Sequence, residues 1–136
     1  YNHALFAQRV HDVMTISSYL LTPRDASQPP IKKVSLAGFG QMGAVAAAAR
    51  AVTGGAIAKA AVDTGGFRFG QLLDYRHPMF LPGGAKYLDV PGLLCVGSTQ
   101  PLWVAGEQDH TLFRSATPHI EGTDARTAAA AWLGRR

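Results

Sequence analysis

Hydrophobic and polar positions divide the 136-residue chain into alternating helical and strand-like segments. In residues 3–21, five apolar side chains fall on one face at helical spacing, which predicts an amphipathic helix: Phe6, Val10, Val13, Met14 and Leu20. A polar loop with three prolines follows at 22–30. The apolar run at 32–39 then predicts a strand, and the alanine-rich residues 42–52 predict a second helix that ends at Gly54 and Gly55.

The second half of the chain continues this alternation. Residues 56–66 form an apolar run of strand length, and residues 67–100 form a long irregular region rich in proline, glycine and aromatic residues. The remaining segments are a strand at 101–109, a short helix at 111–116, a short strand at 118–122 and a terminal helix at 124–136.

This order predicts an α/β fold with a mostly parallel sheet of about four strands and helices on both faces. The length suits one domain over residues 1–136. In such sheets, binding and catalytic sites gather at the carboxyl ends of the strands. Those ends are expected at Gly38–Gly43, Asp63–Phe67 and Gly106–His110.

Composition narrows the possible functions. Hydrophobic residues make up 47% of the chain and charged residues 16%, which indicates a globular domain with a buried core. The net charge of +4 comes from scattered lysines and arginines, so nucleic-acid binding is not expected. The single cysteine, Cys95, excludes an internal disulfide and is expected as a small core residue.

No apolar run approaches a membrane span, and the histidines lack metal-binding spacing, so we expect no membrane partner, metal or cofactor. The chain begins at Tyr1 within a predicted helix. We therefore expect it to be the later part of a longer protein, whose location this segment leaves open.

The glycine-rich turn after the first strand admits two interpretations. Gly38, Gly40 and Gly43 match the Gly-x-Gly-x-x-Gly pattern that binds a dinucleotide pyrophosphate. Asp63 lies at the end of the next strand, where such proteins have the carboxylate that binds the ribose. Alternatively, the turn is the nucleophile elbow of a hydrolase, Gly-x-Ser-x-Gly, with Gly40 at the serine position. The elbow interpretation explains more of the chain, because Asp109 then follows a later strand at the place of the catalytic acid.

Four segments carry a resemblance to a known family: "YNHALFAQRVHDV", "AVDTGGFRF", "FLPGGAKYLDVPGLL" and "LWVAGE". Together they resemble the C-terminal half of acetyl xylan esterase-like proteins of the α/β-hydrolase superfamily. The resemblance implies an eight-stranded sheet of which this chain supplies strands five to eight, and an activity on acyl esters of carbohydrates. It also implies that the N-terminal half of the fold or a partner chain completes the sheet. A secreted or periplasmic location is compatible with the resemblance.

The chain departs from that family at the catalytic positions. Gly40 has no nucleophilic oxygen, and no histidine lies at 122–124, where the base is expected. Met42 stands where the elbow motif has its second glycine, so its side chain is expected to crowd the turn. A Ser-His-acid mechanism needs all three groups within hydrogen-bond reach. Asp109 is left as the acid, with His119 and His110 as the candidate bases.

Structural roles also explain these residues. Asp109 suits a cap on the following helix, His119 an interior histidine with its polar atoms paired, and Asp63 a turn. Ser35, in the first strand, is expected to be buried and unreactive. Our hypothesis is a hydrolase relative without catalysis that acts as a structural or ligand-binding module and keeps a pocket for an acylated ligand. An esterase completed by residues from elsewhere and an NAD(P)-binding unit are the alternatives.

Overall fold

The sheet has the predicted α/β architecture. A computed structural model describes residues 4–23, 25, 27, 29–96, 100–109, 111–113, 116–119 and 123–135. Four strands form one parallel sheet in the order β1-β2-β3-β4: β1 (Val34–Gly38), β2 (Ile57–Asp63), β3 (Leu102–Ala105) and β4 (Thr117–Pro118). Each strand pairs in parallel with the next strand along the chain. A crossover connection that contains helices or loops therefore joins each pair.

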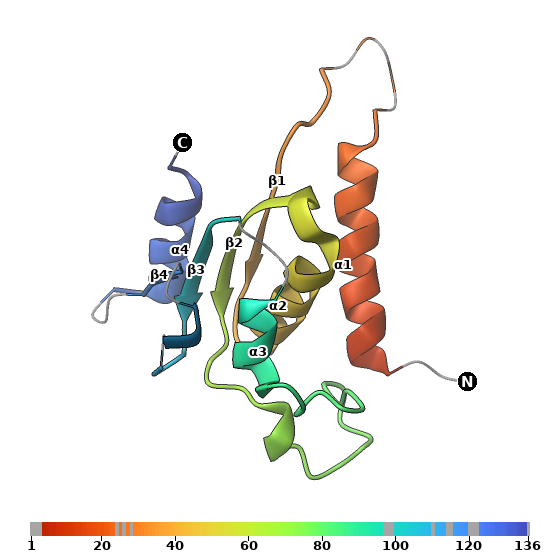
Figure 1. Ribbon diagram of the computed structural model, residues 1–136. Helices are drawn as coiled ribbons and strands as arrows, with labels where there is room; N and C mark the ends of the chain where they lie inside the picture. Colours follow the sequence, from red (N-terminus) through yellow and green to blue (C-terminus); the bar gives the residue numbers. More distant parts are fainter. Residues whose placement is uncertain are drawn as a thin grey trace.

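Helices cover both faces of the sheet, as predicted (Figure 1). Helix α2 (Gln41–Thr53) packs on β1 and β2, and α1 (Leu5–Leu21) packs on the outer side of α2. Helix α4 (Ala125–Leu133) covers β2 and β3 on the opposite face. The layers are therefore α1, α2, the sheet and α4.

Alternate residues of β2 and β3 point to opposite sides of the sheet, which creates two cores. On one side, Ala60, Val62 and Val104 pack against the small side chains of α2. On the other side, Ala61 and Trp103 pack against α4. The alanines of α2 explain its close approach, because their side chains add little thickness between helix and strand.

Helix α1 is amphipathic, as its spacing predicted. Phe6 and Val10 are buried, and the Phe6 ring meets Phe69 edge-on with centroids 5.0 Å apart. Ser17 is also buried on this face, where its hydroxyl donates to the Val13 carbonyl oxygen at 2.8 Å. The buried polar group is therefore paired within the helix.

The region between β2 and β3 is less irregular than predicted. It contains the short 3-10 helix η2 (Phe69–Gln71) and α3 (Asp89–Cys95). The sequence "DVPGLLC" did not predict α3, because proline and glycine usually end helices. Pro91 lies in the first turn, where its missing N–H has no helical partner to lose, and Gly92 packs against the Tyr87 carbonyl.

Two burial predictions were wrong. Cys95 is exposed at the last position of α3, where its thiol donates to the Leu112 carbonyl oxygen at 3.2 Å. Ser35 is also exposed, together with Ala37, because α4 covers β2 and β3 but leaves that face of β1 open. Among the described residues, no helix combines the length and apolar character of a membrane span.

Candidate functional site

The carboxyl ends of β1, β2 and β3 meet, as the parallel topology predicted. A Cβ atom added to Gly65, after β2, would lie 3.7 Å from the Gly40 Cα atom, after β1. A Cβ atom on Gly106, after β3, would lie 2.5 Å from the Gly65 backbone nitrogen. The three strand exits are thus close at the backbone, and side chains from all three can face one site.

Gly40 forms the apex of the turn between β1 and α2. Its φ of 58° and ψ of −132° place it in a region that favours glycine. A Cβ atom added there would have no neighbour within 4 Å. The apex therefore has a backbone conformation that would strain any residue with a Cβ atom, together with open space and no functional group. Gly40 occupies the position predicted for the nucleophile.

Close packing of the turn depends on Gly38 and Gly43. A Cβ atom on Gly43 would overlap the Asp63 carbonyl oxygen, and one on Gly38 would lie 2.6 Å from the Met42 carbonyl oxygen. Met42 was expected to crowd the turn, but its side chain is 44% exposed. That expectation was wrong because Gly43, one residue later, makes the close approach to β2.

Asp63 and Asp109 both fix turns at strand exits. The Gly65 N–H donates to Asp63 Oδ1 at 3.0 Å, and the Thr111 N–H donates to Asp109 Oδ1 at 2.8 Å. The second bond lies at the start of the 3-10 helix η3 (Thr111–Phe113), where a cap was expected for Asp109. Asp109 is exposed to solvent.

His119 follows β4 and lies against β3. Its backbone N–H donates to the Val104 carbonyl oxygen at 2.7 Å, and its ring meets Trp103 with centroids 5.3 Å apart. The ring atom Nδ1 is buried without a hydrogen-bond partner among the described residues, so the expectation of a fully paired interior histidine was wrong. His110 lies outside the described residues.

The position expected for the catalytic base carries a structural group. Asp124 caps α4, where its Oδ2 accepts the Thr127 N–H at 2.8 Å. The preceding Gly122 lies outside the described residues. No hydrogen bond joins the His119 ring to Asp109 in the described part of the chain.

The buried carboxylate of this site is Glu107, whose role the sequence pattern did not indicate. Its side chain is 1% exposed and forms a bidentate pair with Arg68, at 2.9 Å to Oε1 and 2.5 Å to Oε2. The Thr64 hydroxyl also donates to Oε1 at 2.6 Å. The acid next to the β3 exit and the arginine after "DTGGF" were the available signals, but their pairing across 39 residues needed the fold.

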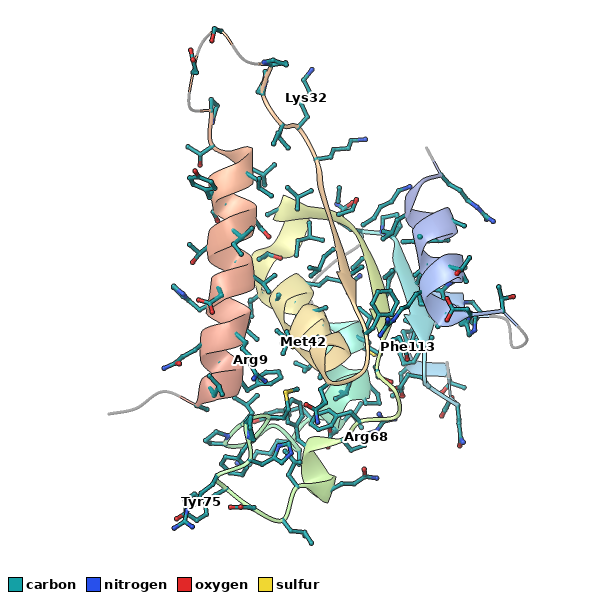
Figure 2. All side chains as sticks on the ribbon, turned by 180° about the vertical axis from the view of Figure 1, so that it is seen from behind. Arg9, Lys32, Met42, Arg68, Tyr75 and Phe113 are labelled. Carbon is teal, nitrogen blue, oxygen red and sulfur yellow. The ribbon has the colours of Figure 1, made fainter. Side chains whose placement is uncertain are left out.

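An open cleft of about 500 Å³ lies beside this ion pair. Its lining joins the exits of β2 and β3 to α3 and η3, and its described residues are Gly66, Arg68, Gln71, Pro91, Gly106, Glu107, Gln108, Asp109 and Leu112. In Figure 2, Arg68 is labelled below Met42, and Met42 marks the start of α2. The mixed polar and apolar lining suits a small ligand with both kinds of surface.

Among the described residues, the cleft offers hydrogen-bonding groups but no assembled proton relay. Both oxygens of Glu107 already accept charged or hydroxyl donors, so this carboxylate is held in place and occupied. The described residues contain no group of three or more His, Cys, Asp or Glu side chains placed to hold a metal ion. Searches against protein-family models, curated proteins and solved structures found no match for the chain.

Proposed function

We propose that this chain is a non-catalytic module of the α/β-hydrolase type, related to the acetyl xylan esterase-like proteins that its sequence resembles. The observation that carries the proposal is the apex of the β1–α2 turn. Gly40 has the positive φ and open surroundings suited to an elbow, yet it supplies no oxygen. The turn keeps its shape without a group that can attack an ester.

The surrounding residues support the same proposal. Glu107 is occupied by Arg68 and Thr64, and the Asp109 carboxylate holds the start of η3. A nucleophile needs a base that is itself oriented by a third group. The His119 ring has no such hydrogen bond to either acid among the described residues.

The open cleft supports a binding role. It lies next to the Gly40 turn and offers Gln71 and Gln108 as polar contacts beside the apolar Pro91 and Leu112. A ligand with an acyl group and hydroxyl groups matches both surfaces. In this proposal the module binds such a ligand without cleaving it.

The test is hydrolysis of nitrophenyl acetate by the parent chain, Gly40→Ser and Gly40→Ala. We expect equal background rates for all three, because a serine hydroxyl without an oriented base stays protonated near neutral pH. We also expect Gly40→Ser and Gly40→Ala to lose about 1–3 kcal/mol of unfolding free energy, because the backbone conformation at position 40 is strained for any residue with a Cβ atom.

The alanine variant separates strain from chemistry. Turnover by Gly40→Ser well above both the parent and Gly40→Ala would show that a working base survives, with His119 and His110 the first candidates. Turnover by the parent chain itself would favour the alternative of an active esterase and reject the proposal.

A dinucleotide-binding unit is the second candidate. Its supporting observation is Gly43, which packs α2 tightly onto β2 as the third glycine of that pattern does. Against it, the Met42 and Gly43 N–H groups already donate to Phe39 and Gly40, and Asp63 Oδ1 is engaged with Gly65. Fewer backbone donors therefore remain for a pyrophosphate.

A further inference from the structure

Arg68 uses only part of its guanidinium group within the fold. A guanidinium carries five N–H donors in one plane. Nη1 donates to Glu107 Oε1 at 2.9 Å and to the Phe67 carbonyl oxygen at 2.8 Å, and Nη2 donates to Glu107 Oε2 at 2.5 Å. The Nε–H group and the second N–H group of Nη2 have no acceptor among the described residues. These two donors lie on the same side of the guanidinium plane's outline, and we call them the open edge of Arg68.

The open edge borders the cleft. Arg68 belongs to the cleft lining and its side chain is 28% exposed, whereas Glu107, on the engaged edge, is 1% exposed. Glu107 is itself fixed by the Thr64 hydroxyl, which donates to Oε1 at 2.6 Å. The ion pair therefore holds Arg68 in one orientation with two donors left for a ligand. Because the donors are already held in place, a ligand that binds them causes little further loss of side-chain freedom.

Charge decides which kind of acceptor suits this edge. Glu107 already balances the charge of Arg68, and the exposed carboxylate of Asp109 lies in the same lining. The described lining residues include no other basic side chain. An anionic ligand would therefore meet a lining of net negative charge, and like charges brought together weaken binding. A neutral acceptor oxygen is favoured over a carboxylate or a phosphate.

A carbonyl oxygen suits the open edge, because its two lone pairs accept two N–H groups at once. Pro91 and Leu112, in the same lining, suit the alkyl part of an acyl group. The side-chain amides of Gln71 and Gln108 form no hydrogen bond with the described residues and suit hydroxyl groups. We propose that the open edge of Arg68 binds the carbonyl oxygen of the ligand's acyl group and makes the cleft selective for neutral, acylated ligands. This inference rests on the proposed binding function of the cleft.

The test is an NMR titration of the isotope-labelled chain with three matched sugars: methyl glucoside that carries one acetyl ester, methyl glucoside itself, and methyl glucuronide. We expect the acetylated sugar to bind about tenfold more tightly than either of the others, because only it supplies a neutral carbonyl oxygen. The Nε–H signal of Arg68 should shift with the acetylated sugar and stay in place with methyl glucoside.

Two variants separate recognition of the acyl group from general packing. Lysine keeps a positive charge beside Glu107 but lacks the planar fork, so Arg68→Lys should lose the preference for the acetylated sugar. Gln108→Leu should weaken the binding of methyl glucoside and of its acetate alike, and keep the preference. Thermal unfolding checks that both variants are folded, and the Arg68 signal of the parent chain tests the contact without any substitution.

The outcomes distinguish this inference from the proposed function. An Arg68 Nε–H signal that stays in place on saturation with the acetylated sugar, or a preference unchanged in Arg68→Lys, would overturn the role of Arg68 and leave the binding module standing. Tighter binding of methyl glucuronide would also overturn it, because the edge would then be an anion site. Free acetate in the same spectra, with the preference intact, would support Arg68 and reject the non-catalytic function. Binding of none of the sugars by the parent chain would overturn both.

Discussion

Glu107 and Arg68 show how one residue pair organises the strand exits. Glu107 follows β3, whereas Arg68 and Thr64 follow β2, so their contacts join the two exits. The Glu107 side chain is 1% exposed and that of Arg68 is 28% exposed. Removing one partner of such a pair leaves a buried or half-buried charge without compensation, which costs more than the pair contributes when intact.

We predict that Arg68→Met lowers the unfolding free energy by about 3 kcal/mol and Glu107→Gln by about 2 kcal/mol, since the remaining Arg68 can reach solvent. The double variant should lose clearly less than the sum, because neither charge is then left alone. Urea denaturation of the four chains gives the cycle. Additive losses would show that the two side chains do not interact in solution.

The glycines of the β1–α2 turn also differ from one another in what each residue contributes. Gly40 supplies a backbone conformation, with open space around it, whereas Gly43 supplies contact, because a Cβ atom there would overlap the Asp63 carbonyl oxygen. The sequence pattern alone treats these glycines as equivalent. Only their surroundings separate the residue that needs φ freedom from the one that needs space.

At the scale of elements, α4 begins at a carboxylate. Asp124 Oδ2 accepts both the Thr127 N–H and the Thr127 hydroxyl at 2.8 Å. These hydrogen bonds from Thr127 lower the pKa of Asp124, because they favour the ionised form. On this face of the sheet, α4 is the described helix that covers β2 and β3. The position where α4 begins therefore affects how Trp103 and Ala61 are packed.

The sign of the pH effect follows from that lowered pKa. The ionised Asp124 stabilises the folded chain above its unfolded pKa, and this contribution disappears as pH falls through the lower folded pKa. We predict that Asp124→Ala lowers the thermal midpoint at neutral pH, and that Asp124→Asn, which keeps a cap, lowers it less.

The difference between the parent and Asp124→Ala should shrink as pH falls below the ordinary aspartate range. Thermal unfolding across acidic and neutral pH measures it. A difference that stays constant over this range would reject capping by the ionised carboxylate.

At the scale of the whole molecule, the strand order bears on the dinucleotide alternative. Nucleotide-binding sheets place the ligand where the strand order reverses, between neighbouring strands whose helices lie on opposite faces. The described strands run β1-β2-β3-β4 without a reversal. The glycine pattern is present, but the described sheet lacks the crevice in which a dinucleotide lies.

We therefore predict that NAD and NADP at millimolar concentration leave the thermal midpoint of the chain unchanged. A nucleotide present at a hundredfold excess over its dissociation constant would add about 2.7 kcal/mol to stability and raise the midpoint measurably. Differential scanning fluorimetry with each nucleotide, and with AMP as a control, measures this. A saturable rise with NAD or NADP alone would favour the dinucleotide-binding unit over our proposal.

Sequence periodicity determined the α/β class, the order of the elements and the positions of the strand exits. This was possible because apolar spacing reports which face of each segment is buried, and segments of β1, β2, α1, α2 and α4 have clear spacing. Residue type and position also identified Asp63 as a turn-forming carboxylate and Asp109 as a helix cap, since such bonds join near neighbours. The glycine-rich turn with Gly38, Gly40 and Gly43 was readable from the sequence as well, because its residues are near neighbours in the chain.

Only the tertiary structure decided the rest, because those features depend on residues far apart in the chain. It paired Glu107 with Arg68 across 39 residues and placed α3 beside α2 despite Pro91. The apolar composition of β1 suggested that Ser35 is buried. In the structure Ser35 is exposed, because α4 covers the neighbouring strands β2 and β3 but not β1. Local pattern states which side chains favour burial, whereas the arrangement of layers decides which surfaces are covered.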